Sequence, residues 1–162
     1  MGSLRTDKRF RHIKRAFRDG GDRFGLRLAE FSVQSKHVHL IVEADGKRAL
    51  SRGLQGLAIR IARGVNRASR RRGKVLADRF HARLLRTPDE VTNAIHYVRR
   101  NLHHHTRDRS PYVDPFSSMS GEAAWHVERD GSAQRVIARA RSWLLRRALE
   151  SRVRRRRALN RR

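Results

Sequence analysis

The chain has 162 residues, and its 40 Lys and Arg against 15 Asp and Glu give a formal net charge of +25 at pH 7. This length suits one domain with a short extension, and a hydrophobic content of 38% suffices for one small core. The lack of cysteine excludes disulfides, thiolate metal sites and a cysteine nucleophile. No apolar run approaches the ~18 residues of a membrane span, and the N-terminus lacks a secretory signal, so we expect a cytoplasmic protein without a membrane partner.

The excess of arginine is the first indication of function. Only five of the 40 cations are lysines. Arginine binds phosphate through two parallel hydrogen bonds, and a basic surface gains affinity for nucleic acid by releasing condensed counterions. A GC-rich genome would explain arginine in place of lysine but not the surplus of positive charge. We therefore expect nucleic acid as the partner, ahead of an anionic membrane surface.

The first half of the chain predicts helix, strand, strand and helix. A helix is expected over residues 6–18, because apolar side chains recur there at helical spacing, at Phe10, Ile13 and Phe17. Residues 24–33 and 37–43 are typical of two antiparallel strands, with an irregularity near Glu30 in the first. A long helix over 47–71, with Asp45 as its N-cap, would bury Leu50, Leu54, Leu57, Ile61 and Val65.

The second half predicts strand at 75–76 and 79–85, then a helix to about residue 104. Thr87, Pro88 and Glu90 form a capping box at the start of that helix. We divide the chain into a domain over 1–110, a linker over 111–132 whose residues 111–121 are rich in Pro, Ser and Asp, and a C-terminal helix with a basic tail over 133–162.

Two histidines are candidates for metal ligands. His37 and His39 are two residues apart in a predicted strand, so both side chains leave the same face, about 7 Å apart at the backbone. Two imidazoles at that spacing can converge on one divalent ion. The alternative is a half-exposed polar face without a ligand.

A tyrosine and an asparagine share one face of the helix that begins at Thr87. Tyr97 and Asn101 are four residues apart, which places them one turn from each other. Tyr97 could act as a nucleophile and Asn101 as a metal ligand through its amide oxygen. Cations nearby, from Arg99, Arg100 or a metal, would favour the phenolate. The alternative is a tyrosine that flanks the core with its hydroxyl at the surface.

The order of these motifs resembles the HUH superfamily, specifically the single-tyrosine transposases of bacterial insertion sequences and their REP-associated relatives. The matching segments are 37–42, 76–81 and 97–101, which read HVHLIV, LADRFH and YVRRN. The resemblance implies an α+β fold in which helices pack on an antiparallel sheet of ferredoxin-like type. It also implies cleavage and rejoining of single-stranded or hairpin DNA in the bacterial cytoplasm, in association with the nucleoid.

The resemblance assigns a role to each candidate residue. His37, His39 and Asn101 would hold Mg²⁺ or Mn²⁺ against the scissile phosphate, and Tyr97 would attack it, giving a 5′-phosphotyrosine and a free 3′-hydroxyl. Family members act as monomers or as homodimers. We expect the DNA to contact arginines of the long helix and of the tyrosine helix: Arg60, Arg63, Arg67, Arg70, Arg71, Arg99 and Arg100.

This sequence departs from the family pattern in three places. The insertion-sequence branch usually has glutamine where Asn101 stands, whereas the REP-associated branch has asparagine. Leu102 follows the asparagine where the REP-associated branch commonly has proline. The family's sheet begins with a strand that pairs beside the His-x-His strand, and we expect the sheet of this chain to lack that first strand. Two other functions are therefore considered: a nucleic-acid-binding module without catalysis, and a decayed, truncated transposase.

Overall fold

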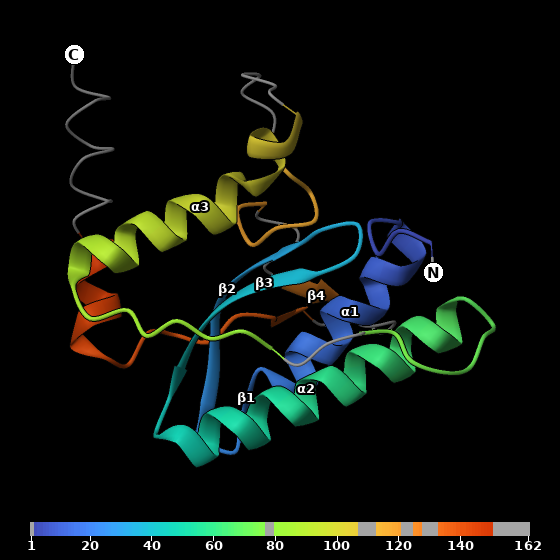
Figure 1. Ribbon diagram of the computed structural model, residues 1–162, viewed down its shortest axis with the longest axis horizontal. Coiled ribbons are helices and arrows are strands. Elements are labelled where there is room, and N and C mark those ends of the chain that lie inside the picture. Colours follow the sequence, from blue (N-terminus) through green and yellow to red (C-terminus); the bar gives the residue numbers. More distant parts are fainter. Residues whose placement is uncertain (1, 77–79, 107–112, 121–124, 128–132, 151–162) are drawn as a thin grey trace.

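The computed structural model describes residues 2–76, 80–106, 113–120, 125–127 and 133–150 (Figure 1). Its centre is an antiparallel sheet of three strands in the order β1-β2-β3, formed by Asp22–Arg23, Leu26–Val33 and Val38–Ala44. Two helices, α1 (Asp7–Gly20) and α2 (Lys47–Ala68), cover one face of this sheet, and α3 (Pro88–Thr106) covers the other. The expected α+β class with an antiparallel sheet is confirmed.

The alternation of side chains along β3 decides which residues meet which helix. Val38, Leu40 and Val42 pack against the core that α1 and α2 form with β2. Ile41 belongs instead to the core beneath α3. Because strand residues two apart share a face, His39 lies on the α3 side together with Ile41.

The expected irregularity in β2 is a β-bulge. The register shifts between Leu28 and Glu30, which pair with Val42 and Ile41 respectively. Leu28 packs in the α1–α2 core, whereas Ala29 packs beneath α3. Glu30 also turns to the α3 side, where it contacts Arg99. The bulge thus directs two consecutive residues to one face, and this places a carboxylate under α3.

The helix ends follow capping chemistry with one exception. Thr6 accepts a hydrogen bond from the backbone of Arg9 at the start of α1, and Thr87 accepts one from Glu90 N–H at the start of α3. The expected cap of α2 by Asp45 is wrong. Gly46 occupies the N-cap position without a side-chain hydrogen bond, because the Asp45 carboxylate accepts a hydrogen bond from Arg27 at 2.6 Å.

The strand expected at 75–76 and 79–85 does not form in its described part. Residues 75–76 make a bend, and 80–86 have no regular secondary structure. Among the described residues this segment pairs with no strand of the β1-β2-β3 sheet. A strand without a hydrogen-bonded neighbour is not stable by itself. Residues 77–79 lie outside the described residues.

The C-terminal third differs most from expectation. The expected linker contributes residues 113–120, whose Asp114 and Ser117 are buried against β2. A short hairpin joins β4 (Trp125–Val127) and β5 (Ala133–Arg135), so the helix expected from 133 is wrong there. Residues 143–150 are helical. The backbone N–H of Ala138 donates to Leu28 of β2, so the residues between hairpin and helix cover a sheet edge. The basic tail at 151–162 lies outside the described residues.

The helix at 143–150 is held by a carboxylate of β3. Glu43 accepts hydrogen bonds from the backbone N–H groups of Arg141 at 2.9 Å and Ser142 at 2.8 Å. The helix then buries Leu145 and Ala148 in the core beneath α3. Glu43 of β3 therefore caps the N-terminus of the helix at 143–150.

This contact should make the fold sensitive to acid. Burial acts to raise the pKa of the Glu43 carboxyl, but hydrogen bonds from Ser142, Arg141 and Arg27 together lower it below its ordinary value of 4.5. A lowered pKa in the folded state means that this stabilisation is present above about pH 4.5 and is lost as the pH falls through the lowered value. We expect Glu43→Gln to lose less thermal stability than the wild type between pH 5 and pH 3, measured by circular dichroism. An equal loss in both proteins would contradict this role.

Candidate functional site

The two histidines converge at the start of β3. His37 ends the turn after β2, and His39 is the second residue of β3. Their rings lie 4.7 Å apart, nearly perpendicular, and the two Nε2 atoms are 3.0 Å from each other. In neutral rings one Nε2–H donates to the other nitrogen, and which one donates depends on the tautomers. The expectation that both side chains leave the same face is confirmed.

Tyr97 of α3 meets this pair. Its ring centroid lies 5.4 Å from that of His39, edge to face at 82°. Tyr97 is 46% exposed, so its side chain borders both the histidine pair and solvent. The contact follows from packing, because Val98 and Ile95 of α3 are buried against Ile41, two residues after His39 on the same face of β3. The tertiary structure thus brings together residues far apart in sequence.

Asn101 lies one helical turn beyond Tyr97, and the environment of its side chain is unusual for an amide. Its side chain is fully buried, at 0% exposure, yet neither Oδ1 nor Nδ2 has a hydrogen-bond partner among the described residues. Each buried polar atom left without a partner costs about 1–3 kcal/mol. Such an arrangement is rare in folded proteins and calls for a ligand, an ion or a bound water.

The two histidines are spaced as two ligands of one divalent ion would be. Metal–nitrogen and metal–oxygen bonds of about 2.1 Å at right angles separate neighbouring ligand atoms by about 3.0 Å. The two Nε2 atoms are 3.0 Å apart, as adjacent ligands of an octahedral ion would be. The amide oxygen of Asn101 is a suitable third donor. No group of three or more His, Cys, Asp or Glu that could hold a metal occurs in the described part of the chain, and a third donor would have to come from another residue type such as this amide.

A buried ion pair supports the helix that carries Tyr97 and Asn101. Arg99 Nε donates to Glu30 Oε2 at 2.9 Å, and a second guanidinium nitrogen contacts Oε1. The hydroxyl of Ser118 also donates to Glu30. Glu30 is 3% exposed, so the pair joins α3, β2 and the 113–120 segment inside the protein. Sequence reasoning missed Glu30 as a site residue, although a charged residue within an apolar strand at an irregularity was a usable signal.

The arginines expected to contact DNA fall into separate groups. Arg99 is engaged with Glu30, and Arg100 is exposed on α3 near Tyr97. The remaining five lie on α2 or directly after it, and α2 covers the face of the sheet opposite α3. The structure therefore does not bring these five together with the histidine–tyrosine cluster: Arg60, Arg63, Arg67, Arg70 and Arg71. Their contacts with DNA stay a prediction.

Two general findings complete the description of the chain. Within the described ranges, no helix has both the length and the apolar character needed to cross a lipid bilayer. Comparison of the chain with protein-family models, with curated proteins and with solved structures finds no match.

Proposed function

We propose that the protein is a metal-dependent single-tyrosine nuclease and strand transferase acting on single-stranded or hairpin DNA. The observation that carries this proposal is the cluster at the α3 face, where the Tyr97 ring contacts His39 and His39 contacts His37. The buried amide of Asn101 on the same helix face has no hydrogen-bond partner in the described part of the chain, and it adds a donor that needs a ligand. A structural tyrosine at the edge of the core would not require that donor.

Each side chain has a defined task in this reaction. His37, His39 and Asn101 would hold Mg²⁺ or Mn²⁺, which would supply positive charge to the phosphate oxygens as negative charge develops. The Tyr97 hydroxyl oxygen forms a bond to phosphorus, and the bond from phosphorus to the 3′ oxygen of the preceding nucleotide breaks. The phenol gives its proton to water, since Tyr97 is partly exposed, and the leaving oxygen gains a proton as a free 3′-hydroxyl.

The finer fold assignment belongs to the same proposal. A ferredoxin-like sheet of HUH type is supported by the order α1, β2, β3, α2 and by a His-x-His strand that faces the tyrosine helix. In the described residues no strand pairs with the outer edge of β3, where the family has its first strand. The proposed setting is the bacterial cytoplasm with the nucleoid, and the protein acts there as a monomer or a homodimer.

The expected product of this reaction is a covalent protein–DNA adduct. Incubation with Mn²⁺ and a labelled single-stranded hairpin should give a band that survives SDS, and EDTA should abolish it. Tyr97→Phe should reduce the adduct at least 1000-fold, to background, because no other group replaces the attacking oxygen. The chain has two tyrosines, so Tyr112→Phe is a matched control that should keep the adduct. Adduct formation by the Tyr97→Phe protein would remove the proposed nucleophile.

A second candidate function is a nucleic-acid-binding module without catalysis. It is favoured by the net charge of +25 and by the exposed arginines of α2, remote from the tyrosine. Its signature in the same experiment is tight, salt-sensitive binding of the hairpin with no adduct under any metal condition. Absence of both binding and adduct would favour a decayed transposase.

A further inference from the structure

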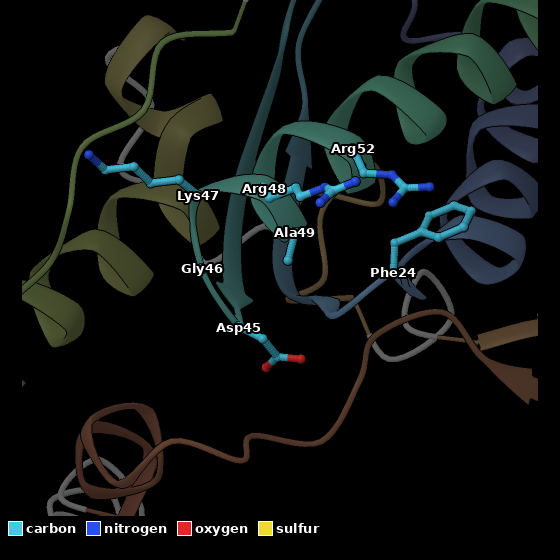
Figure 2. A pocket seen from close by; sticks show the side chains of 7 residues that line it. All are labelled: Phe24, Asp45, Gly46, Lys47, Arg48, Ala49 and Arg52. Atoms are coloured by element: carbon cyan, nitrogen blue, oxygen red, sulfur yellow. The ribbon is translucent and has the colours of Figure 1, made fainter.

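An open pocket of about 450 Å³ lies at the N-terminal end of α2 (Figure 2). It adjoins the end of β3, whereas the two histidines lie at the start of this strand. β3 separates the two places. His37 precedes its first residue and Asp45 follows its last, and eight residues of extended chain span roughly 26 Å. The pocket is lined by Phe24, Asp45, Gly46, Lys47, Arg48, Ala49 and Arg52. Neither the two histidines nor Tyr97 lines this pocket.

The aromatic wall of this pocket is an exposed side chain in an unfavourable backbone conformation. Phe24 and Gly25 form the two-residue turn between β1 and β2, with φ of 58° and 75°. Such turns favour Asn, Asp or Gly at the first position, and a bulky residue there is strained. Phe24 is nevertheless present, and it is 53% exposed instead of packed in a core. Folding gains little from this ring, which suggests that it serves a ligand.

Two guanidinium groups lie over the Phe24 ring. The Arg52 Cζ lies 5.6 Å and the Arg23 Cζ 5.9 Å from the ring centroid. Figure 2 shows the side chains of Arg48 and Arg52 extending together towards the Phe24 side of the pocket, whereas Lys47 points away. An aromatic ring with guanidinium groups packed over it offers aromatic and guanidinium planes on which a nucleobase can stack, together with positive charge for the flanking phosphates.

The positive side chains that line the pocket outnumber its carboxylates. The first turn of α2 has no acidic residue and no side-chain cap, although cations there oppose the helix dipole. The nearby carboxylate of Asp45 is already paired with Arg27, whose hydrogen bond lowers the pKa of Asp45 below its ordinary value. An anion bound beside Arg48 and Arg52 would relieve this imbalance.

We infer that this pocket, here called the Phe24 site, binds single-stranded DNA, with one unpaired base stacked on Phe24 and a neighbouring phosphate held by Arg48 and Arg52. Unpaired bases are required, because a base inside a duplex does not expose its face to a side chain. The Phe24 site continues onto the arginines of α2, since Gly56 lies beside the Phe24 ring and Arg60 donates to the Gly56 carbonyl at 3.0 Å. The inference goes beyond the proposed cleavage and does not depend on it.

Binding is measured by fluorescence anisotropy in EDTA, so that Tyr97 chemistry cannot contribute. The probes are a labelled oligonucleotide of twelve thymidines and an abasic chain with the same number of phosphates. We expect the wild-type protein to bind the thymidine probe about tenfold more tightly, a difference that one stacked base can supply. Phe24→Asn should abolish this preference, so that both probes bind with about equal affinity. Its thermal stability should be unchanged or higher, since Asn suits a φ of 58°.

Trp143→Asn is the matched control for Phe24→Asn, and Arg147→Ala is the matched control for Arg52→Ala. Trp143 is exposed at 65% on the helix at 143–150, so Trp143→Asn removes an exposed aromatic ring elsewhere and should keep the tenfold preference. Arg52→Ala should lower the slope of log affinity against log salt by about one, because one phosphate contact is lost. Arg147→Ala removes the same charge on the 143–150 helix and should change that slope less.

Each contrary outcome overturns the inference. Retention of the base preference by Phe24→Asn, or its loss in Trp143→Asn, would remove Phe24 as the stacking platform. Equal binding of a 12-base-pair duplex would show contact with phosphates alone. Tighter binding of a uridine ribo-oligonucleotide than of the thymidine probe would assign the Phe24 site to RNA instead of DNA. None of these outcomes bears on adduct formation by Tyr97.

Discussion

Replacing Asn101 by leucine is expected to stabilise the metal-free protein by about 1–3 kcal/mol while removing its stabilisation by Mn²⁺. Leucine is similar in size, and it replaces two buried polar atoms that have no partner among the described residues. Without metal, the desolvation cost of the amide disappears. With metal, the wild type gains a third donor that leucine cannot supply, so Mn²⁺ should raise the wild-type unfolding temperature alone.

The measurement is urea unfolding in EDTA, followed by thermal unfolding with increasing Mn²⁺. Asn93→Leu is the matched control, because Asn93 is exposed on the same helix. It should change the free energy of unfolding by no more than about 0.5 kcal/mol and leave the Mn²⁺ effect intact. An Asn101→Leu protein that is less stable without metal, or that still responds to Mn²⁺ like the wild type, would contradict the role of Asn101 as a ligand.

Removing Glu30 is expected to have the largest destabilising effect. Glu30→Ala leaves the Arg99 guanidinium beneath α3 without its carboxylate, at a side-chain exposure of only 20%. Breaking a buried pair in this way costs about 3–5 kcal/mol. The loss should be measured by urea unfolding. Because the pair anchors α3 beside Tyr97, adduct formation should fall as well under conditions in which the variant remains folded.

A double-mutant cycle separates the pair from its parts. Glu30→Ala combined with Arg99→Ala should be less destabilised than the sum of the single variants, because no charge is then left buried without a partner. The exposed pair of Arg83 and Glu90 is the control, and Arg83→Ala should cost less than about 1 kcal/mol. A loss below about 1 kcal/mol for Glu30→Ala would show that the pair is not a structural anchor.

Short-range patterns explain why several elements could be predicted. The apolar spacing of Phe10, Ile13 and Phe17 places one face of α1 in the core, and all three are buried. The sequence Thr87-Pro88 marks the start of α3 because capping depends on neighbours only. The same holds for the His-x-His spacing, since alternation along a strand is a local property.

Elements that depend on distant partners were predicted poorly. Residues 80–86 have the composition of a strand, but a strand needs a hydrogen-bonded neighbour, and this segment pairs with no strand of the described sheet. The apolar residues after 133 have helical spacing, yet Val136 is buried in the α1–α2 core, next to a backbone contact with β2. Asp45 is a residue type that commonly caps helices, but its carboxylate accepts a hydrogen bond from Arg27 instead.

The sequence by itself determined the antiparallel hairpin and the helices that flank it, and it singled out the four residues that we propose as metal ligands and nucleophile. These follow from spacing within a few residues, which fixes the face on which each side chain lies. The tertiary structure decided that Tyr97 contacts His39, that Asn101 is buried with no hydrogen-bond partner among the described residues, and that Glu30 and Arg99 pair beneath α3. Those outcomes depend on how α3 packs on the sheet, and packing between distant segments leaves no periodic signal in the chain.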